Sequence, residues 1–148
     1  MHFVVAYDGT PITDTALARA GTLADGVDGA VTAVTILPQG NTEYARERGW
    51  IGDDDPWERD SILDGLRRSV DSVATNATFV FKMVDRYAPR GKIGRVIRTT
   101  AETADVDVLV IGTENAGRVF ATLTTVTQSV ANGTYDLHVV RSVPSLSE

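Results

Sequence analysis

Cysteine is absent from the 148-residue sequence, and histidine occurs only at His2 and His138. The absence of cysteine excludes disulfide bonds, thiolate nucleophiles and cysteine-ligated zinc sites. With one histidine near each end of the chain, a multi-histidine metal site or a histidine-based catalytic triad is disfavoured. We therefore predict no catalytic residue and no metal site.

Long apolar runs are also missing, since no stretch approaches the roughly 18 residues that a membrane-spanning helix needs. The opening sequence MHFVVAY has neither the basic region nor the extended apolar core of a signal peptide, so we expect a cytoplasmic protein. Positive charge is scarce, because the formal net charge is −6. This balance argues against a general affinity for nucleic acid. We expect neither a nucleic-acid nor a membrane partner.

Short apolar runs alternate with segments of helical periodicity along the chain. Apolar runs of this kind indicate strands that are buried on both faces, and strands separated by helices are expected to be parallel. The predicted strands are Phe3–Tyr7, Ala30–Leu37, Thr78–Val84, Val106–Gly112 and Leu137–Val143. The pattern predicts a single α/β domain over residues 1–143, followed by a tail over residues 144–148.

Helix start signals follow the first strand and precede the third. Thr10 is a candidate N-cap, with Pro11 at the first helical position, where a missing N–H costs nothing. Asp55 and Pro56 repeat this arrangement before the second helix. The apolar spacing predicts two further helices, around residues 93–104 and 119–130.

The connection over residues 38–55 is polar and irregular, and loops of this length in a compact domain are usually functional or mobile. Its acidic run, Asp53–Asp55, fits either a cation site or a solvated helix cap. Consecutive acids rarely converge on a metal without further ligands at set spacing, so we favour the helix cap. Trp50 and Trp57 flank this run. They fit a lid or a partner-binding surface, but an anchor of the loop on the domain is the plainer explanation.

A ligand of an open parallel sheet binds beyond the carboxyl ends of the strands, where the strand order reverses. If the first strand lies beside the fourth, the loops Tyr7–Thr10 and Gly112–Gly117 flank one crevice. Asp8 then fits two roles, which are hydrogen bonding to a ligand and support of the turn. Ile36 likewise fits an apolar ligand contact or a simple core position.

Three segments, in the order found here, resemble the universal stress protein A family. FVVAYDGTPITDTALARA resembles the first strand, the Asp-Gly-Ser/Thr turn and the helix of that family. AETADVDVLVIGT resembles its passage from the third helix into the fourth strand, and LHVVRS resembles its last strand. The resemblance implies a Rossmann-like fold of the adenine-nucleotide alpha-hydrolase type. It is an open five-stranded parallel sheet of order 3-2-1-4-5 with helices on both faces.

The ATP-binding branch of this family carries Gly, two residues, Gly, nine residues, and then Gly followed by Ser or Thr. Here Gly112 matches the first glycine, and Asn115 stands at the second. Thr124 stands at the third after eight intervening residues, one fewer than in the family, and Thr125 keeps the hydroxyl. Asn enters left-handed conformations readily, but the Cβ of Thr124 stands where a glycine admits phosphate oxygens.

The resemblance implies a nucleotide site for ATP or AMP, with Mg²⁺ accompanying a triphosphate. The residues implied at this site are Tyr7, Asp8, Gly9, Ile36, Ile111, Gly112, Asn115, Gly117, Thr124, Thr125 and Val126.

The predicted last strand is expected to lie at an edge of the sheet, and an apolar edge strand invites pairing. The family resemblance implies antiparallel pairing of two last strands across a dimer axis, and we predict a homodimer. Because side chains alternate along a strand, His138 and Val140 are expected on one face. The interface residues are Leu137, His138, Val139, Val140 and Arg141.

These observations favour a homodimeric, universal-stress-type regulatory or protective protein with a nucleotide-sized crevice. The degenerate glycine loop leaves a second hypothesis open, in which the crevice is vestigial and the protein is an interaction module. A slow nucleotide hydrolase, with Thr124 or Thr125 near the terminal phosphate, ranks last because the sequence offers no evident base or Mg²⁺ ligand set.

Overall fold

The computed structural model describes residues 1–112 and 135–141, and the predicted helix around residues 119–130 lies outside this part. None of the described helices has the length and apolarity to cross a membrane. In chain order the elements are β1 (His2–Ala6), α1 (Pro11–Val27), β2 (Ala30–Pro38), α2 (Thr42–Glu47), α3 (Arg59–Val73), β3 (Thr78–Val84), α4 (Arg90–Thr103), β4 (Val108–Gly112) and β5 (Asp136–Val140).

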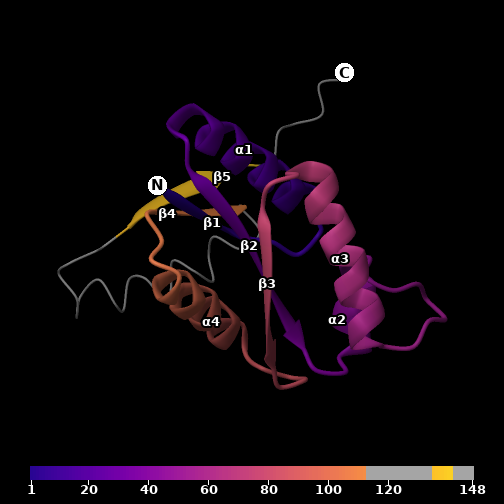
Figure 1. The fold of residues 1–148 in the computed structure, drawn as a ribbon. Coiled ribbons are helices and arrows are strands. Elements are labelled where there is room, and N and C mark those ends of the chain that lie inside the picture. Colours follow the sequence, from indigo (N-terminus) through magenta and orange to yellow (C-terminus); the bar gives the residue numbers. More distant parts are fainter. Residues whose placement is uncertain (113–134, 142–148) are drawn as a thin grey trace.

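The described strands form one parallel sheet of order β3-β2-β1-β4-β5 (Figure 1), which confirms the predicted fold. Ala6 of β1 pairs with Val34 of β2, and Val5 pairs with Val110 of β4. The strand order therefore reverses at β1, because the chain moves outward to β2 and β3 and then returns to β4. This places the carboxyl ends of β1 and β4 side by side.

Two hydrophobic layers cover the sheet, as expected for strands that are buried on both faces. One layer packs the sheet against α1 and α3, and the other packs it against α4 (Figure 1). Alternate residues of β1 enter opposite layers, with Val5 on the α1 and α3 face and Val4 on the α4 face. All of the strand side chains from Phe3 to Ala6 are buried.

The connection after β2 is more ordered than predicted, because it contains the helix α2. The Asn41 side chain caps this helix by accepting a hydrogen bond from the Tyr44 backbone N–H at 3.0 Å. Ala45 is fully buried against the α1 and α3 layer. Within the connection over residues 38–55, the prediction of an irregular segment was therefore wrong for Thr42–Glu47. The six-residue helix is too short to show a clear apolar periodicity.

The predicted cap of the next helix was also wrong. α3 begins at Arg59 with Glu58 at the N-cap position, so neither Asp55 nor Pro56 belongs to the helix start. The Asp55 carboxylate instead accepts a hydrogen bond from the Gly52 N–H at 2.9 Å. At α1, Thr10 does occupy the N-cap position before Pro11, but its side chain makes no capping bond. The Thr10 hydroxyl donates to Asp8 instead.

Candidate functional site

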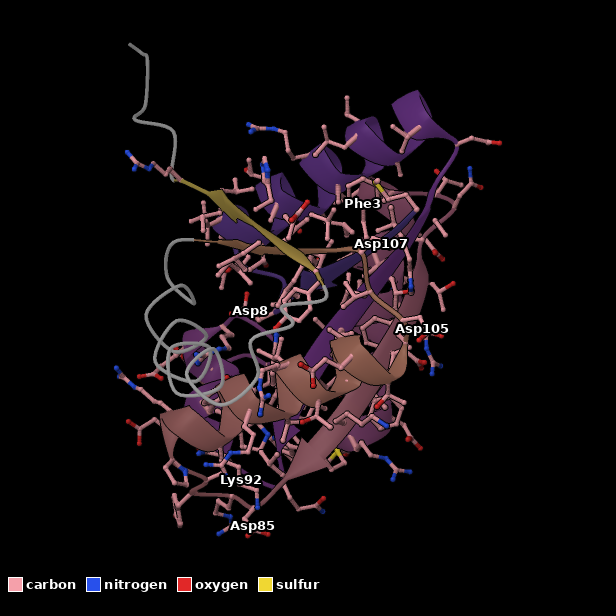
Figure 2. All side chains as sticks on the ribbon, turned by 90° about the vertical axis from the view of Figure 1, so that its left-hand side faces the viewer. Phe3, Asp8, Asp85, Lys92, Asp105 and Asp107 are labelled. Atoms are coloured by element: carbon pink, nitrogen blue, oxygen red, sulfur yellow. The ribbon has the colours of Figure 1, made fainter. Side chains whose placement is uncertain are left out.

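Asp8 lies at the carboxyl edge of the sheet, directly after β1 and Tyr7, whereas Asp105 and Asp107 precede β4 near the opposite edge (Figure 2). The Oδ1 atom of Asp8 accepts three hydrogen bonds from the start of α1. The donors are the Thr10 N–H at 3.0 Å, the Thr10 hydroxyl at 2.6 Å and the Thr13 hydroxyl at 2.9 Å. The carboxylate is therefore held in one orientation, with its other oxygen directed to a different partner.

That partner comes from the connection after β2. Arg48 Nε lies 3.5 Å from Asp8 Oδ2, and both side chains are largely buried, with exposed fractions of 13% and 15%. The Arg48 guanidinium carbon lies 3.4 Å from the centre of the Tyr44 ring, a cation–π geometry. Arg48 thus joins α2 to the end of β1.

Trp50 makes a second link to the same turn, because its Nε1 donates to the Asp8 carbonyl at 2.7 Å. Its ring lies 5.6 Å from that of Tyr44, measured between centroids. Trp50 therefore anchors the connection on the domain, which is the plainer of the two roles that the sequence allowed. We refer to Asp8, Tyr44, Arg48 and Trp50 as the Asp8 cluster.

The Asp8 cluster borders a small crevice between the sheet and α4. Asp8 and Tyr7 line it from β1, Ile36 lines it from β2, and Tyr44 and Ile93 line it from α2 and α4. The cavity measures about 20 Å³, which is room for roughly a single water molecule. The structure therefore brings Asp8 and Ile36 together in the lining of one crevice, and Tyr44 lines the same crevice from α2.

Tyr7 presents mainly its backbone to this region, since its ring lies in the α1 and α3 layer. Its hydroxyl donates to Asp14 Oδ1 at 2.8 Å. Burial, together with this hydrogen bond, raises the pKa of Tyr7 above the usual value for tyrosine. Its backbone N–H donates to the Val34 carbonyl, and its carbonyl accepts from the Thr35 hydroxyl at 2.7 Å. The polar groups of Tyr7 are thus committed to the protein itself.

At two of the predicted site positions, Gly9 and Gly112, backbone conformation and packing explain the glycine without a ligand. Gly9 has φ +80°, a conformation that side chains disfavour, and a Cβ there would lie 3.3 Å from Leu66 Cδ2. A Cβ on Gly112 would lie 2.8 Å from Cγ1 of Ile12 in α1. The close approach of α1 to the end of β4 therefore requires a glycine at position 112. Ile111 is buried in the α4 layer.

The remaining predicted nucleotide-site residues, Asn115, Gly117, Thr124, Thr125 and Val126, lie outside the described residues. Tyr44 and Arg48 were not among the predicted site residues. The sequence contained one signal for them, which was their place in a long polar connection. It could not show that Arg48 pairs with Asp8, because the two residues are 40 positions apart in the chain. Within residues 1–112 and 135–141, no group of three or more acidic or histidine side chains is arranged to hold a metal ion.

β5 lies at one edge of the described sheet, and only β4 pairs with it there. Its side chains alternate as predicted. Leu137 and Val139 pack against the α4 layer, whereas Val140 is buried in the α1 and α3 layer. His138 is partly buried, and Arg141 follows the strand with an exposed side chain. The pairing of two such strands across a dimer axis stays a prediction.

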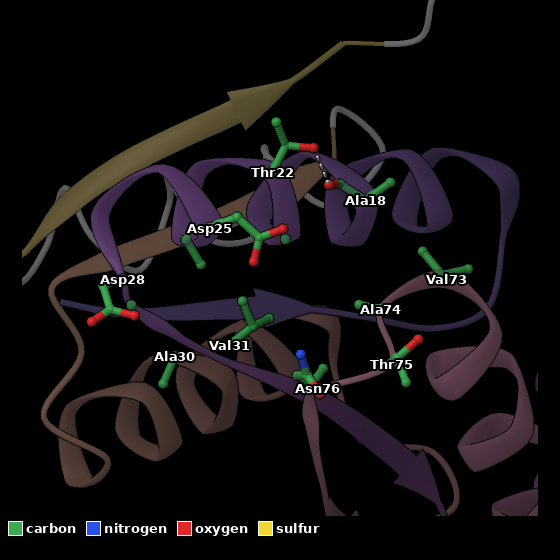
Figure 3. A pocket seen from close by; sticks show the side chains of 14 residues that line it. Ala18, Thr22, Asp25, Asp28, Ala30, Val31, Val73, Ala74, Thr75 and Asn76 are labelled. Carbon is green, nitrogen blue, oxygen red and sulfur yellow. Dashed lines mark hydrogen bonds between the residues drawn. The ribbon is translucent and has the colours of Figure 1, made fainter.

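A larger pocket, of about 450 Å³, lies at the amino edge of the sheet, where the strands begin (Figure 3). It opens between the end of α1, the start of β2 and the turn after α3. Asp25 and Asp28 face it from one side, and Thr75 and Asn76 face it from the other. None of the predicted site residues lines this pocket.

Solved structures of universal stress proteins have a fold similar to that of this chain. A structure of a universal stress protein in complex with cAMP has 20% identity and a TM-score of 0.52, with 98% of each chain covered. The Archaeoglobus fulgidus universal stress protein in complex with dAMP has 18% identity and a TM-score of 0.55, over 95% of this chain and 97% of that chain. A universal stress protein family member from Burkholderia pseudomallei has 14% identity and a TM-score of 0.62, over 95% and 96%.

At these identities the solved structures show the shared fold alone. None of the curated proteins matches the sequence significantly. The family model gives the stronger assignment, because the model of the universal stress protein family matches residues 1–141. With that match over nearly the whole chain, and with the sheet order in agreement, this chain belongs to the universal stress protein family.

Proposed function

We propose that this protein is a cytoplasmic, homodimeric stress-response regulator that binds an adenine nucleotide at the carboxyl edge of its sheet. The observation that carries the proposal is the convergence of Asp8 and Ile36 on one crevice, beside the end of β4. The strand order reverses at this place, which is where open α/β sheets bind ligands. The cAMP and dAMP complexes of structurally similar universal stress proteins support an AMP-type ligand.

Each side chain has a role that its chemistry suits. The Asp8 carboxylate accepts hydrogen bonds from ribose hydroxyls through Oδ2, since Oδ1 is already occupied. Ile36 offers an apolar surface to the base. The phosphates would follow the loop after Gly112, where the motif residues Asn115, Gly117, Thr124, Thr125 and Val126 stand, with Mg²⁺ accompanying a triphosphate.

The small volume of the crevice gives the ligand a regulatory effect. A cavity of about 20 Å³ offers little room for a purine, so we expect Tyr44, which lines it from α2, to move when the base enters. A ligand that binds only the open arrangement shifts the population toward it. Nucleotide binding is thereby converted into a movement of α2, and this movement is the signal that a partner protein would recognise.

The test begins with the purified protein, which is denatured so that any carried nucleotide is released and identified. The emptied protein is then titrated with AMP and ATP by calorimetry. Ile36→Glu places a charge in the crevice and is expected to abolish binding. Leu23→Glu is the matched control, because Leu23 lies in α1 and is already 37% exposed. Circular dichroism checks that both variants are folded.

A second candidate, an interaction module without a nucleotide, is favoured by one observation. The Asp8 cluster already satisfies Asp8 and fills the crevice from within the chain. In that case α2 and the connection around Trp50 form a fixed docking surface. No carried nucleotide and no heat of binding at millimolar ATP would select this candidate over the first.

The proposed dimer pairs two copies of β5 and is tested separately by light scattering after size exclusion. We expect a mass of twice that of one chain. Arg141→Pro removes an N–H next to the proposed pairing edge and should shift the population toward monomer. A wild-type protein that is monomeric at all concentrations would contradict the dimer without affecting the nucleotide proposal.

A further inference from the structure

A second pocket, of about 300 Å³, opens beyond the carboxyl ends of β2 and β3. One wall comes from the α2 region and carries Tyr44 and Arg48. The other wall comes from the turn between β3 and α4 and carries Arg86, Tyr87 and Arg90. This volume is at the lower end of the range of small-molecule pockets. It exceeds the neighbouring crevice at Asp8, with which the pocket shares Tyr44 and Ile93.

The two walls of this pocket are tied together, so the pocket is formed before any ligand arrives. Asn41 Nδ2 donates to the Arg86 carbonyl at 2.7 Å, while Asn41 Oδ1 caps α2. Gly40, at φ +67°, lets the Arg86 guanidinium lie against the turn, since a Cβ there would be 2.8 Å from Nη2. The backbone of Arg86 is thus held by Asn41, and its guanidinium lies beside Gly40.

The pocket is lined mainly by positively charged side chains, although the protein carries a net negative charge. Three arginines line it, against one glutamate, in a chain whose net charge is −6. Glu47 is 64% exposed and lies 3.9 Å from Arg48, and Arg48 also pairs with Asp8. Arg86 and Arg90 form no ion pair with any residue in the described part of the chain.

Two tyrosines give the pocket an aromatic component. The Arg86 guanidinium carbon lies 6.0 Å from the centre of the Tyr87 ring, and Tyr87 is 81% exposed. An exposed tyrosine beside an arginine offers a flat surface and a hydroxyl to the organic part of a ligand. The guanidinium groups suit the anionic part, because their N–H groups match the oxygens of phosphate.

We propose that this pocket binds the phosphate group of a small phosphate ester, with Arg86 and Arg90 as its principal ligands. The site adjoins the nucleotide crevice at Asp8, with which it shares Tyr44 and Ile93, but Arg86 and Arg90 lie outside that crevice. Lys92 and Asp85 lie near the same turn (Figure 2) but do not line the pocket, which makes Lys92 suitable for a control.

Calorimetry with pyrophosphate at low ionic strength tests the site, because pyrophosphate supplies the anion without a base. We expect binding by the wild type, and a loss of affinity of about tenfold or more in Arg86→Gln/Arg90→Gln. The control Lys92→Gln/Arg95→Gln removes the same charge from the same region of the chain, outside the pocket. It is expected to retain affinity within about twofold.

Adenosine, which lacks a phosphate, distinguishes this site from the Asp8 crevice. Binding of pyrophosphate without adenosine would sustain the phosphate site while contradicting the nucleotide crevice. The reverse result, or equal loss of pyrophosphate affinity in both double variants, would overturn the phosphate site. If Arg86→Gln/Arg90→Gln does not fold, amide shifts of the wild type decide. Pyrophosphate must then perturb Asn41 and Ala88, and unperturbed amides there would refute the site.

Discussion

The two edges of the sheet carry pockets that differ in size, charge and internal bonding. At the amino edge, the pocket of about 450 Å³ is faced by Asp25 and Asp28. Figure 3 shows a hydrogen bond between two of its lining residues, from the Thr22 hydroxyl to the Ala18 carbonyl at 3.2 Å, and this bond is local to α1. At the carboxyl edge, smaller cavities are bordered by paired side chains from distant parts of the sequence, such as Asp8 with Arg48.

The comparison shows that the edge with the smaller cavities is the one where polar side chains from distant parts of the sequence meet, as Asp8 and Arg48 do. A helix that connects two parallel strands starts at the carboxyl edge and ends at the amino edge, whereas α2 ends at the carboxyl edge, where Arg48 meets Asp8. N–H groups and the loops that hold side chains such as Asp8 therefore gather at the carboxyl edge. At the amino edge, the carbonyl end of α1 lies beside Asp28, an arrangement that the helix dipole does not favour.

The largest difference between the edges is expected for their aspartates. Asp8→Ala removes the acceptor of three hydrogen bonds and the largely buried partner of Arg48, which keeps only the exposed Glu47 as an ion-pair partner. We expect this variant to lose about 3 kcal/mol of unfolding free energy. Asp25→Ala changes an exposed side chain and should stay within about 0.5 kcal/mol of wild type. Urea denaturation measures both, and equal losses would remove the distinction between the two edges.

A smaller loss of stability is expected at Gly112, at the end of β4, and Gly26 in α1 is its counterpart near the amino edge. Gly112→Ala places a Cβ against Ile12 at 2.8 Å, and such overpacking costs about 2 kcal/mol. Gly26, near the amino-edge end of α1, has no atom within 4 Å of the position that a Cβ would take. Gly26→Ala should therefore stabilise the helix by up to about 1 kcal/mol. Thermal and urea unfolding of both variants would show whether the carboxyl end of β4 tolerates a side chain.

The smallest difference concerns two tyrosines. Tyr7→Phe loses the hydrogen bond to Asp14 and is expected to cost about 1 kcal/mol near neutral pH. Tyr135 precedes β5 at the amino edge, and its hydroxyl has no hydrogen-bond partner in the described part of the chain. Tyr135→Phe should therefore cost less than Tyr7→Phe. A larger loss in Tyr135→Phe would reverse the comparison.

The same tyrosines give the protein an alkaline limit. Burial comes first among the causes that raise the pKa of both Tyr7 and Tyr135 above the value for an unfolded chain. The unfolded chain thus releases these protons first, at about pH 10. Stability from this source is present below that pH and is lost as the pH rises above it. Urea midpoints of the double variant Tyr7→Phe/Tyr135→Phe should fall less steeply in alkali than those of wild type.

Much of the architecture could be predicted from local patterns. Apolar runs such as Phe3–Tyr7 predicted strands buried on both faces, and Pro11 predicted the start of α1 correctly. The cap at Asp55 was wrong because a carboxylate can accept a backbone N–H from a preceding turn as easily as from a helix. The helix α2 was missed because six residues are too few for a periodic signal.

The candidate site also has features that the sequence predicted and features that it did not. The sequence by itself determined that Asp8 follows a buried strand and that Ile36 lies in the next strand, because strand order along the chain is local information. Only the tertiary structure decided that Arg48 and Trp50 return to Asp8, and that Arg86 joins Arg48 around one pocket. Those contacts depend on the path of a connection and on side-chain packing across more than one layer, for which no spacing rule exists.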